Sequence, residues 1–254
     1  MTSSTPATTT SPAASAAGQR PAAVRALRAA LRAGGTQPVL KSSSTPPAVT
    51  VILPQDDTGT FFLPTGEGLA PDAARALGQA LLRWNVAAEV SVVDLAGAPA
   101  LQIALTSLLD AERLAGLVRE HLPEPHAAAH QLREALHAAG IHADDLRAEA
   151  QGHQGLVRIG GISAESAAVL CHVLSGRECE DLDLEEWPDL HQLADRLAID
   201  VQTLLSDPVD VKANPACTRC QHSRSHEVTL GTLTPRAARR LAAAVEAAAT
   251  GVKP

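Results

Sequence analysis

Aromatic residues are scarce in this sequence, whose 254 residues include two Phe, two Trp and no Tyr. Domains that bind single-stranded nucleic acid stack the bases on aromatic side chains, so four aromatic residues argue against that class. No apolar run approaches the roughly 20 residues that a membrane-spanning helix needs. The N-terminus also lacks the charged and then apolar pattern of an export signal, so we expect a cytoplasmic protein without a membrane span.

The sequence has few cysteines and no standard catalytic motif. Four Cys are too few to staple a chain of this length, so we expect reduced thiols rather than a disulfide scaffold. The sequence has no Gly-x-Ser-x-Gly elbow and no Gly-rich phosphate loop with a Lys. Two pairs of adjacent carboxylates, Asp56-Asp57 and Asp144-Asp145, fall at expected turns or helix caps, where Asp is common for conformational reasons. These observations favour a protein that is not an enzyme.

Acidic residues are missing from the first 55 positions, which carry five cations and therefore a charge of +5. The formal net charge of the chain is −7, so the remaining residues together carry −12. A body this acidic repels phosphate backbones, which disfavours a large nucleic-acid surface. DNA binding would have to use the N-terminal arm.

Residues 1–47 are expected to be a disordered tail that contains one short basic helix. Ser, Thr, Pro, Ala and Gly dominate positions 1–19 and lack the apolar mass that ordering requires. A helix is predicted over 21–33, with Pro21 in its first turn and Gly34-Gly35 after its end. Its Arg residues indicate either a basic arm for an acidic partner or a marginal helix in a solvated tail.

A repeated template predicts four further helices. Each copy has a short apolar strand, a cap position, and then Ala, Leu and an aliphatic residue four, seven and eleven positions after the cap. Those offsets lie on one helix face. The four cap positions are Ala70, Ser107, Ser163 and Thr234. Ser and Thr accept hydrogen bonds from free backbone donors at a helix start, whereas Ala70 cannot.

Paired strands are predicted before three of these helices, at 48–53 with 60–63, 88–95 with 101–105, and 145–150 with 156–159. The expected fold class is therefore α+β. Three ββα units and an additional helix over 126–139 would share one largely antiparallel sheet that helices cover on one face. The alternative is that this pattern is what any Ala- and Leu-rich α+β chain shows. The expected domains are the tail, an α+β core over 48–178, and a smaller C-terminal region over 179–254.

The strongest chemical motif lies in that C-terminal region and consists of Cys217, Cys220, His222 and His226. Cys-x-x-Cys is the spacing of a knuckle that directs two thiolates at one Zn²⁺, and four such ligands satisfy a closed structural site. The single residue between Cys220 and His222 is shorter than usual. Two ligand sets therefore stay open: one of the two His residues does not bind the metal, or Cys171 or Cys179 completes the set. A redox pair and an incidental polar loop remain as alternatives.

Two weaker patterns support alternative functions. His126, His130 and His137 form a stripe on the predicted helix over 126–139, which would suit a metal-dependent enzyme. The stripe lies away from the expected core face, so an ordinary solvated face is the simpler interpretation. Residues 190–205 resemble a bacterial helix-turn-helix with Ala198 at the turn and Asp200 as a cap, but positions 201–207 contain no Arg or Lys for reading DNA.

The segment 227–245 runs from a strand into Leu-Thr-Pro and an Ala-rich helix. This ending resembles that of uncharacterised actinobacterial accessory proteins, and the resemblance implies a small cytoplasmic protein without an assigned activity. We therefore expect a non-enzymatic cytoplasmic binding or regulatory protein with an unidentified protein partner and a structural zinc site. The alternatives are a DNA-associated regulator and an enzyme that uses the His126/His130/His137 stripe.

Overall fold

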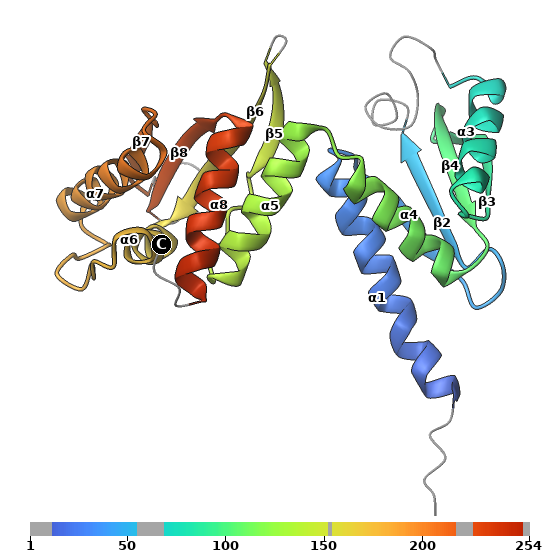
Figure 1. Cartoon of the computed structure of the whole chain (residues 1–254), viewed down its shortest axis with the longest axis horizontal. Helices are drawn as coiled ribbons and strands as arrows, with labels where there is room; N and C mark the ends of the chain where they lie inside the picture. The colour runs from blue at the N-terminus through green and yellow to red at the C-terminus, as the bar shows by residue number, and fades with distance from the viewer. Residues whose placement is uncertain (1–11, 55–68, 152–153, 217–225, 251–254) are drawn as a thin grey trace, which may run out of the picture. The chain divides into compact units, whose positions relative to one another are not determined.

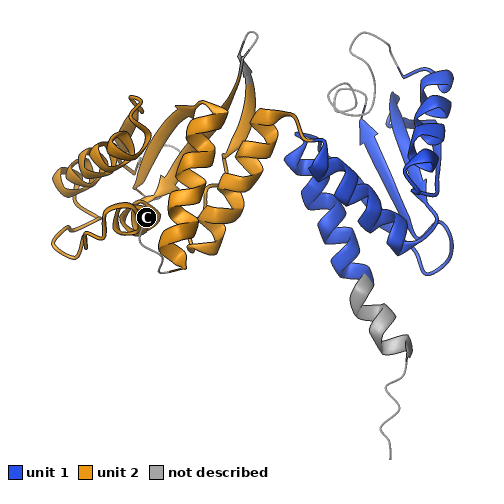
Figure 2. Cartoon of the chain, viewed as in Figure 1, with its two compact units in different colours: residues 1–121 blue, residues 122–254 orange. Residues whose placement is uncertain are grey.

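The protein is a mixed α+β chain of two compact units, residues 1–121 and 122–254 (Figure 2). The computed structural model describes residues 12–54, 69–151, 154–216 and 226–250. The described segments contain seven helices and eight strands (Figure 1). The unit boundary falls where the last helix of the first unit ends, whereas position 178, the expected end of the core, lies inside the second unit.

The first unit holds one four-stranded antiparallel sheet. Its elements are α1 (Pro12–Ala33), β1 (Val39–Ser42), β2 (Val49–Pro54), α3 (Pro71–Arg83), β3 (Ala88–Leu95), β4 (Ala98–Leu105) and α4 (Leu108–Glu120). The strand order is β1-β2-β4-β3. Val51 pairs with Ile103 and Leu53 with Leu101 at the centre of the sheet, and all four side chains are buried. Helix α1 packs against α4, and α3 packs against β3.

The second unit holds its own four-stranded antiparallel sheet. Its elements are α5 (Glu124–Ala138), β5 (Arg147–Gln151), β6 (Gln154–Ser163), α6 (Ala164–Ser175), α7 (Trp187–Leu205), β7 (Val211–Asn214), β8 (Glu227–Leu233) and α8 (Pro235–Ala249). The strand order is β5-β6-β8-β7. Helix α5 packs against α8, and α7 packs against β7. Residues from all four helices join strands β6 and β8 in one hydrophobic core.

The two units therefore repeat one topology. Each runs from a helix through a strand pair, one or two helices and a second strand pair to a final helix, and each joins its strands in the same order. The expectation of a single sheet built from three ββα units is wrong, because the strands form two separate sheets. The repeating module is the whole unit. The expected strand over 60–63 lies outside the described residues.

The repeat extends to individual core residues. The final helices α4 and α8 bury the same residue types at the same spacing from their caps, Ala111, Leu114, Ala115 and Val118 in α4 and Ala238, Leu241, Ala242 and Val245 in α8. The first helices correspond in the same way, with Ala23, Leu27, Ala30 and Leu31 in α1 and Ala128, Leu132, Ala135 and Leu136 in α5. Packing of the first helix on the last helix therefore uses the same small and large side chains in both units.

The first helices also end identically. Gly35 and Gly140 follow α1 and α5 with φ of 83° and 77°, a left-handed conformation that glycine adopts without a steric penalty. The next residue, Thr36 or Ile141, donates its N–H back to the carbonyl of Leu31 or Leu136, at 3.2 and 2.8 Å. This is the hydrogen bond that closes a Schellman motif.

The four helices predicted from the template begin where expected. Their caps are Ala70, Ser107, Ser163 and Thr234. The hydroxyls of Ser107, Ser163 and Thr234 each accept a backbone N–H three residues later, at 3.2, 3.1 and 3.2 Å. Ala70 makes no such bond, and Pro71 occupies the first turn instead. Local capping chemistry thus fixes the start of these helices.

Two expectations about helices need correction. The basic N-terminal helix is a core element of the first unit and not part of a solvated tail, because Leu27 and Leu31 are fully buried. The segment 190–205 lies within α7, which continues without a turn at Ala198, so the expected helix-turn-helix is not formed. Leu190, Leu197 and Val201 lie on the buried side of this single helix, and its apolar period explains why one straight helix is stable.

Candidate functional site

The Cys/His motif falls on the connection between β7 and β8. Cys217, Cys220 and His222 lie outside the described residues, and His226 is the described residue at the end of the motif. Asn214 of β7 pairs with Glu227 of β8, so this connection leaves and re-enters the sheet at neighbouring positions. Cα atoms of such pairs lie about 4.5–5.5 Å apart.

The corresponding hairpin of the first unit is much shorter. Leu95 pairs with Ala98, and only Ala96 and Gly97 lie between them, with φ of 54° and 87°. Two residues with positive φ form the tight type I′ turn that suits the twist of a hairpin. The second unit therefore carries its Cys/His motif as an enlargement of a position where the first unit has a two-residue turn.

His226 is held by two backbone groups. Its Nδ1 accepts the N–H of Ala216 at 3.1 Å, and its carbonyl accepts the N–H of Ala164 at 3.1 Å. An imidazole that accepts at Nδ1 and is neutral carries its proton on Nε2. Coordination of a metal through Nε2 would require the proton to move to Nδ1 and would break the bond to Ala216. The structure thus gives His226 a role in ordering the end of the connection.

The His stripe does not converge on a site in the described segments. His126 and His130 are half-buried on α5, whereas His137 is exposed. Nδ1 of His130 lies 4.0 Å from Oε1 of Glu134, and the ring of His137 contacts that of His142 at a centroid distance of 5.7 Å. No group of three or more His, Cys, Asp or Glu side chains that could hold a metal ion occurs in the described part of the chain.

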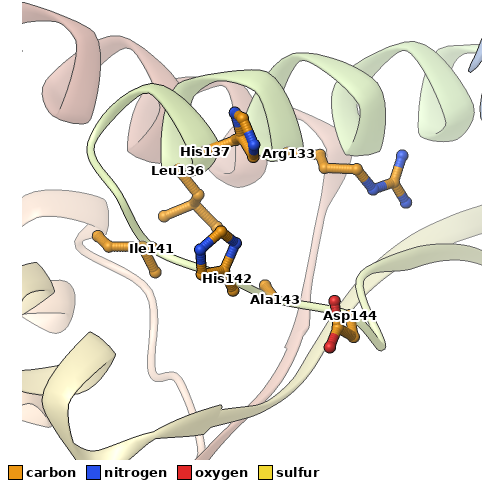
Figure 3. A pocket seen from close by; sticks show the side chains of 7 residues that line it. All are labelled: Arg133, Leu136, His137, Ile141, His142, Ala143 and Asp144. Carbon is orange, nitrogen blue, oxygen red and sulfur yellow. The ribbon is translucent and has the colours of Figure 1, made fainter.

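An open hollow of about 170 Å³ lies at the C-terminal end of α5 (Figure 3). Its lining residues are Arg133, Leu136, His137, Ile141, His142, Ala143 and Asp144. Burial lowers the pKa of Arg133, whose guanidinium donates to the carbonyl of Leu146. This hydrogen bond connects the end of α5 to the backbone of the segment that follows it. Sequence patterns placed His137 in the stripe but gave no signal for His142.

A cluster of thiols and charged side chains in the second unit has closer polar contacts than the His stripe. Cys171 on α6 is fully buried, and its Sγ donates to Oδ2 of Asp200 on α7 at 3.2 Å. Burial, the bond to Asp200 and an interaction with the thiol of Cys179 raise the pKa of Cys171 to about 12. Arg196 binds both carboxylate oxygens of Asp181, at 3.2 and 2.8 Å, and also interacts with the thiol of Cys179. The sequence analysis considered Cys171 and Cys179 only as spare zinc ligands.

Arg196 also sets the charge state of its partner. Hydrogen bonding to this guanidinium holds the pKa of Asp181 below its usual value, and the same contact raises the pKa of Arg196. The pair therefore remains ionised beside the two thiols at neutral pH.

None of the helices in the described segments combines the length and the apolar character needed to cross a bilayer. Comparison with protein-family models, curated proteins and solved structures finds no match to this chain.

Proposed function

We propose that this protein is a non-enzymatic, cytoplasmic binding protein made of two copies of one unit, with a structural zinc loop on the second copy. The observation that supports the proposal is the length of the β7–β8 connection, since the sequence that joins these strands contains Cys217, Cys220, His222 and His226 and the first unit has a two-residue turn at the equivalent point. An insertion of this composition at one equivalent position of a repeated unit indicates a function specific to the second copy.

The sheet favours metal binding in this connection. Because β7 and β8 hold the two ends of the connection side by side, much of the entropy of bringing the ligands together is already offset by strand pairing. A Zn²⁺ ion would take the thiolates of Cys217 and Cys220 and the imidazole of His222, and it would take that of His226 only by breaking the bond to Ala216. The free energy of zinc binding would stabilise the folded form of the β7–β8 connection.

Binding rather than catalysis is supported by the way charged side chains bond to the backbone. The Asp110 carboxylate accepts backbone N–H groups of Ala87 and Ser107. Arg133 donates to the carbonyl of Leu146, and Arg240 donates to the carbonyls of Leu204 and Leu205. These groups hold backbone segments in place, which is a structural role. A protein that binds a partner without catalysing a reaction would have the accessory or regulatory role expected from the sequence.

The DNA-associated alternative now depends on one feature. Helix α1 exposes Arg25, Arg28 and Arg32 on the side opposite its buried residues, which leaves a basic stripe on the surface of the first unit. The second expected element, a recognition helix, is part of the continuous α7 and offers no cation over 201–205. A basic stripe alone supplies phosphate contacts without base readout, so we do not adopt this function.

The zinc loop is tested by metal analysis of the purified full-length protein. We expect one zinc per chain after loading and dialysis, and loss of that zinc in a Cys217→Ser/Cys220→Ser variant, because two of the ligands are removed. His137→Ala is the matched control, since this residue belongs to the other histidine group and should retain the metal. Substoichiometric zinc in the unmutated protein, or equal zinc in the double variant, would remove the proposal.

A further inference from the structure

Two cysteines that the zinc loop does not use lie together between α6 and α7. Cys171 is on α6, and Cys179 is on the segment that leads from α6 to α7. The two helices pack side by side in the second unit (Figure 1). Cys171 is fully buried and Cys179 is partly exposed. Both thiols are free.

Two charged side chains of α7 hold the segments that carry the two cysteines. Asp200 accepts the hydrogen bond of Cys171 at 3.2 Å, and one turn earlier on α7 Arg196 holds Asp181, which follows Cys179 by two residues. Both cysteine-bearing segments are thus bonded to the same stretch of α7, and the two thiols interact. Arg196 binds Asp181 at 2.8 Å and also interacts with Cys179. The cluster thus contains an accessible thiol, a buried thiol beside it, and a carboxylate hydrogen-bonded to the buried thiol.

We propose that Cys171 and Cys179 form a reversible intramolecular disulfide when the protein meets a hydroperoxide. Cys179 reacts first because solvent reaches it. Its sulfur attacks one peroxide oxygen, the O–O bond breaks, and the products are a sulfenic acid on Cys179 and water, or an alcohol when the oxidant is an organic hydroperoxide. Cys171 then attacks the sulfenic sulfur, the S–S bond forms, and hydroxide leaves.

Asp200 supplies what the second step requires. Burial keeps Cys171 protonated, with its pKa raised to about 12, so this thiol needs a base to become a nucleophile. The Asp200 carboxylate already accepts the S–H and takes the proton as the S–S bond forms. That proton joins the departing hydroxide, so one water leaves with each disulfide. Reduction by a small thiol restores both Cys side chains.

The proposal does not depend on the zinc loop. It is therefore tested in a protein in which the two cysteines of that loop are replaced. Full-length Cys217→Ser/Cys220→Ser protein is treated with hydrogen peroxide, and its free thiols and cross-linked peptides are then measured. We expect both remaining thiols to be lost together, a peptide pair joined through Cys171 and Cys179, a monomeric product, and recovery of both thiols with dithiothreitol. Disulfide-linked dimers, or loss of thiols without that peptide pair, would overturn it.

Single substitutions in the same background separate the two steps. Cys171→Ala should leave Cys179 as a sulfenic acid that dimedone traps, whereas Cys179→Ala should leave Cys171 unreactive towards peroxide. Asp200→Asn should increase dimedone trapping at Cys179, because the second step loses its base. Equal trapping with and without Cys171 contradicts the proposal. Should Cys171→Ala fail to fold, the peptide pair in the parent protein still decides the question.

Discussion

At the scale of single residues, Asp110 shows how a local signal acquires a long-range role. Its Oδ2 accepts the N–H and the hydroxyl of Ser107, at 3.0 and 2.5 Å, which completes a capping box at the start of α4. Its Oδ1 accepts the N–H of Ala87 at 3.0 Å, just before β3 begins. The capping box follows from sequence spacing, because both partners lie within one helical turn. The bond to Ala87 required the tertiary structure to bring β3 beside α4.

Asp110→Ala should destabilise the first unit by about 1–3 kcal/mol, because it breaks the capping box with Ser107 and leaves two partly buried backbone donors without their acceptor. Urea unfolding followed through Trp84 in a Trp187→Phe background reports on this unit, since Trp84 contacts His121 and unfolding separates the rings. Glu112→Ala on the exposed side of the same helix is the control and should change stability by less than about 0.5 kcal/mol. Equal effects would contradict this role of Asp110.

At the scale of elements, β6 changes its buried face at a glycine. Successive residues of a strand face opposite sides of the sheet, yet the buried residues of β6 are Val157, Ile159 and Ile162. The side that faces the core therefore changes within the strand, and Gly160 with φ +83° lies in this interval. A Cβ on Gly160 would approach the Cβ of Asp145 to 2.4 Å. Both the backbone conformation and the space at this point require glycine.

Gly160→Ala should destabilise the second unit by about 2–4 kcal/mol, because a positive φ and an overlap with Asp145 act together. The matched control is Gly176→Ala at the end of α6, where φ is +70° but no atom lies within 4 Å of the added Cβ. We expect about 1 kcal/mol for this control, since only the backbone term applies. Urea unfolding monitored through Trp187 in a Trp84→Phe background measures both. A Gly160 penalty no larger than that of Gly176 would contradict the steric argument.

At the scale of the whole molecule, the repeat of one topology makes equivalent core positions comparable. Leu114 in α4 and Leu241 in α8 are both fully buried on the face that carries the shared Ala and Val residues. Each belongs to a separate compact unit with its own sheet. A cavity at one position should therefore lower the stability of its own unit.

Leu114→Ala should lower the unfolding midpoint seen by Trp84 and leave that seen by Trp187 unchanged, and Leu241→Ala should do the reverse. The expected loss is about 2–5 kcal/mol for the affected unit, because each substitution leaves a cavity in a closed core. Urea titrations with the two single-Trp backgrounds measure the midpoints. A shift of both midpoints by either substitution would show that the units unfold as one.

The sequence by itself determined the features that depend on neighbours a few positions apart. Four helix starts were predicted from cap residues and from Ala and Leu spacing, because these bonds and faces form within one or two turns. The Cys/His motif was also visible in the sequence, although the coordination of Cys217, Cys220 and His222 lies outside the described residues.

Only the tertiary structure decided which strands pair, since β6 meets β8 across two intervening helices and no local signal encodes that choice. It also decided that α1 packs one face into the core, that α7 continues past Ala198, and that Cys171 lies beside Asp200. In each case the free energy comes from burying surface against distant parts of the chain, which a pattern of adjacent residues does not record.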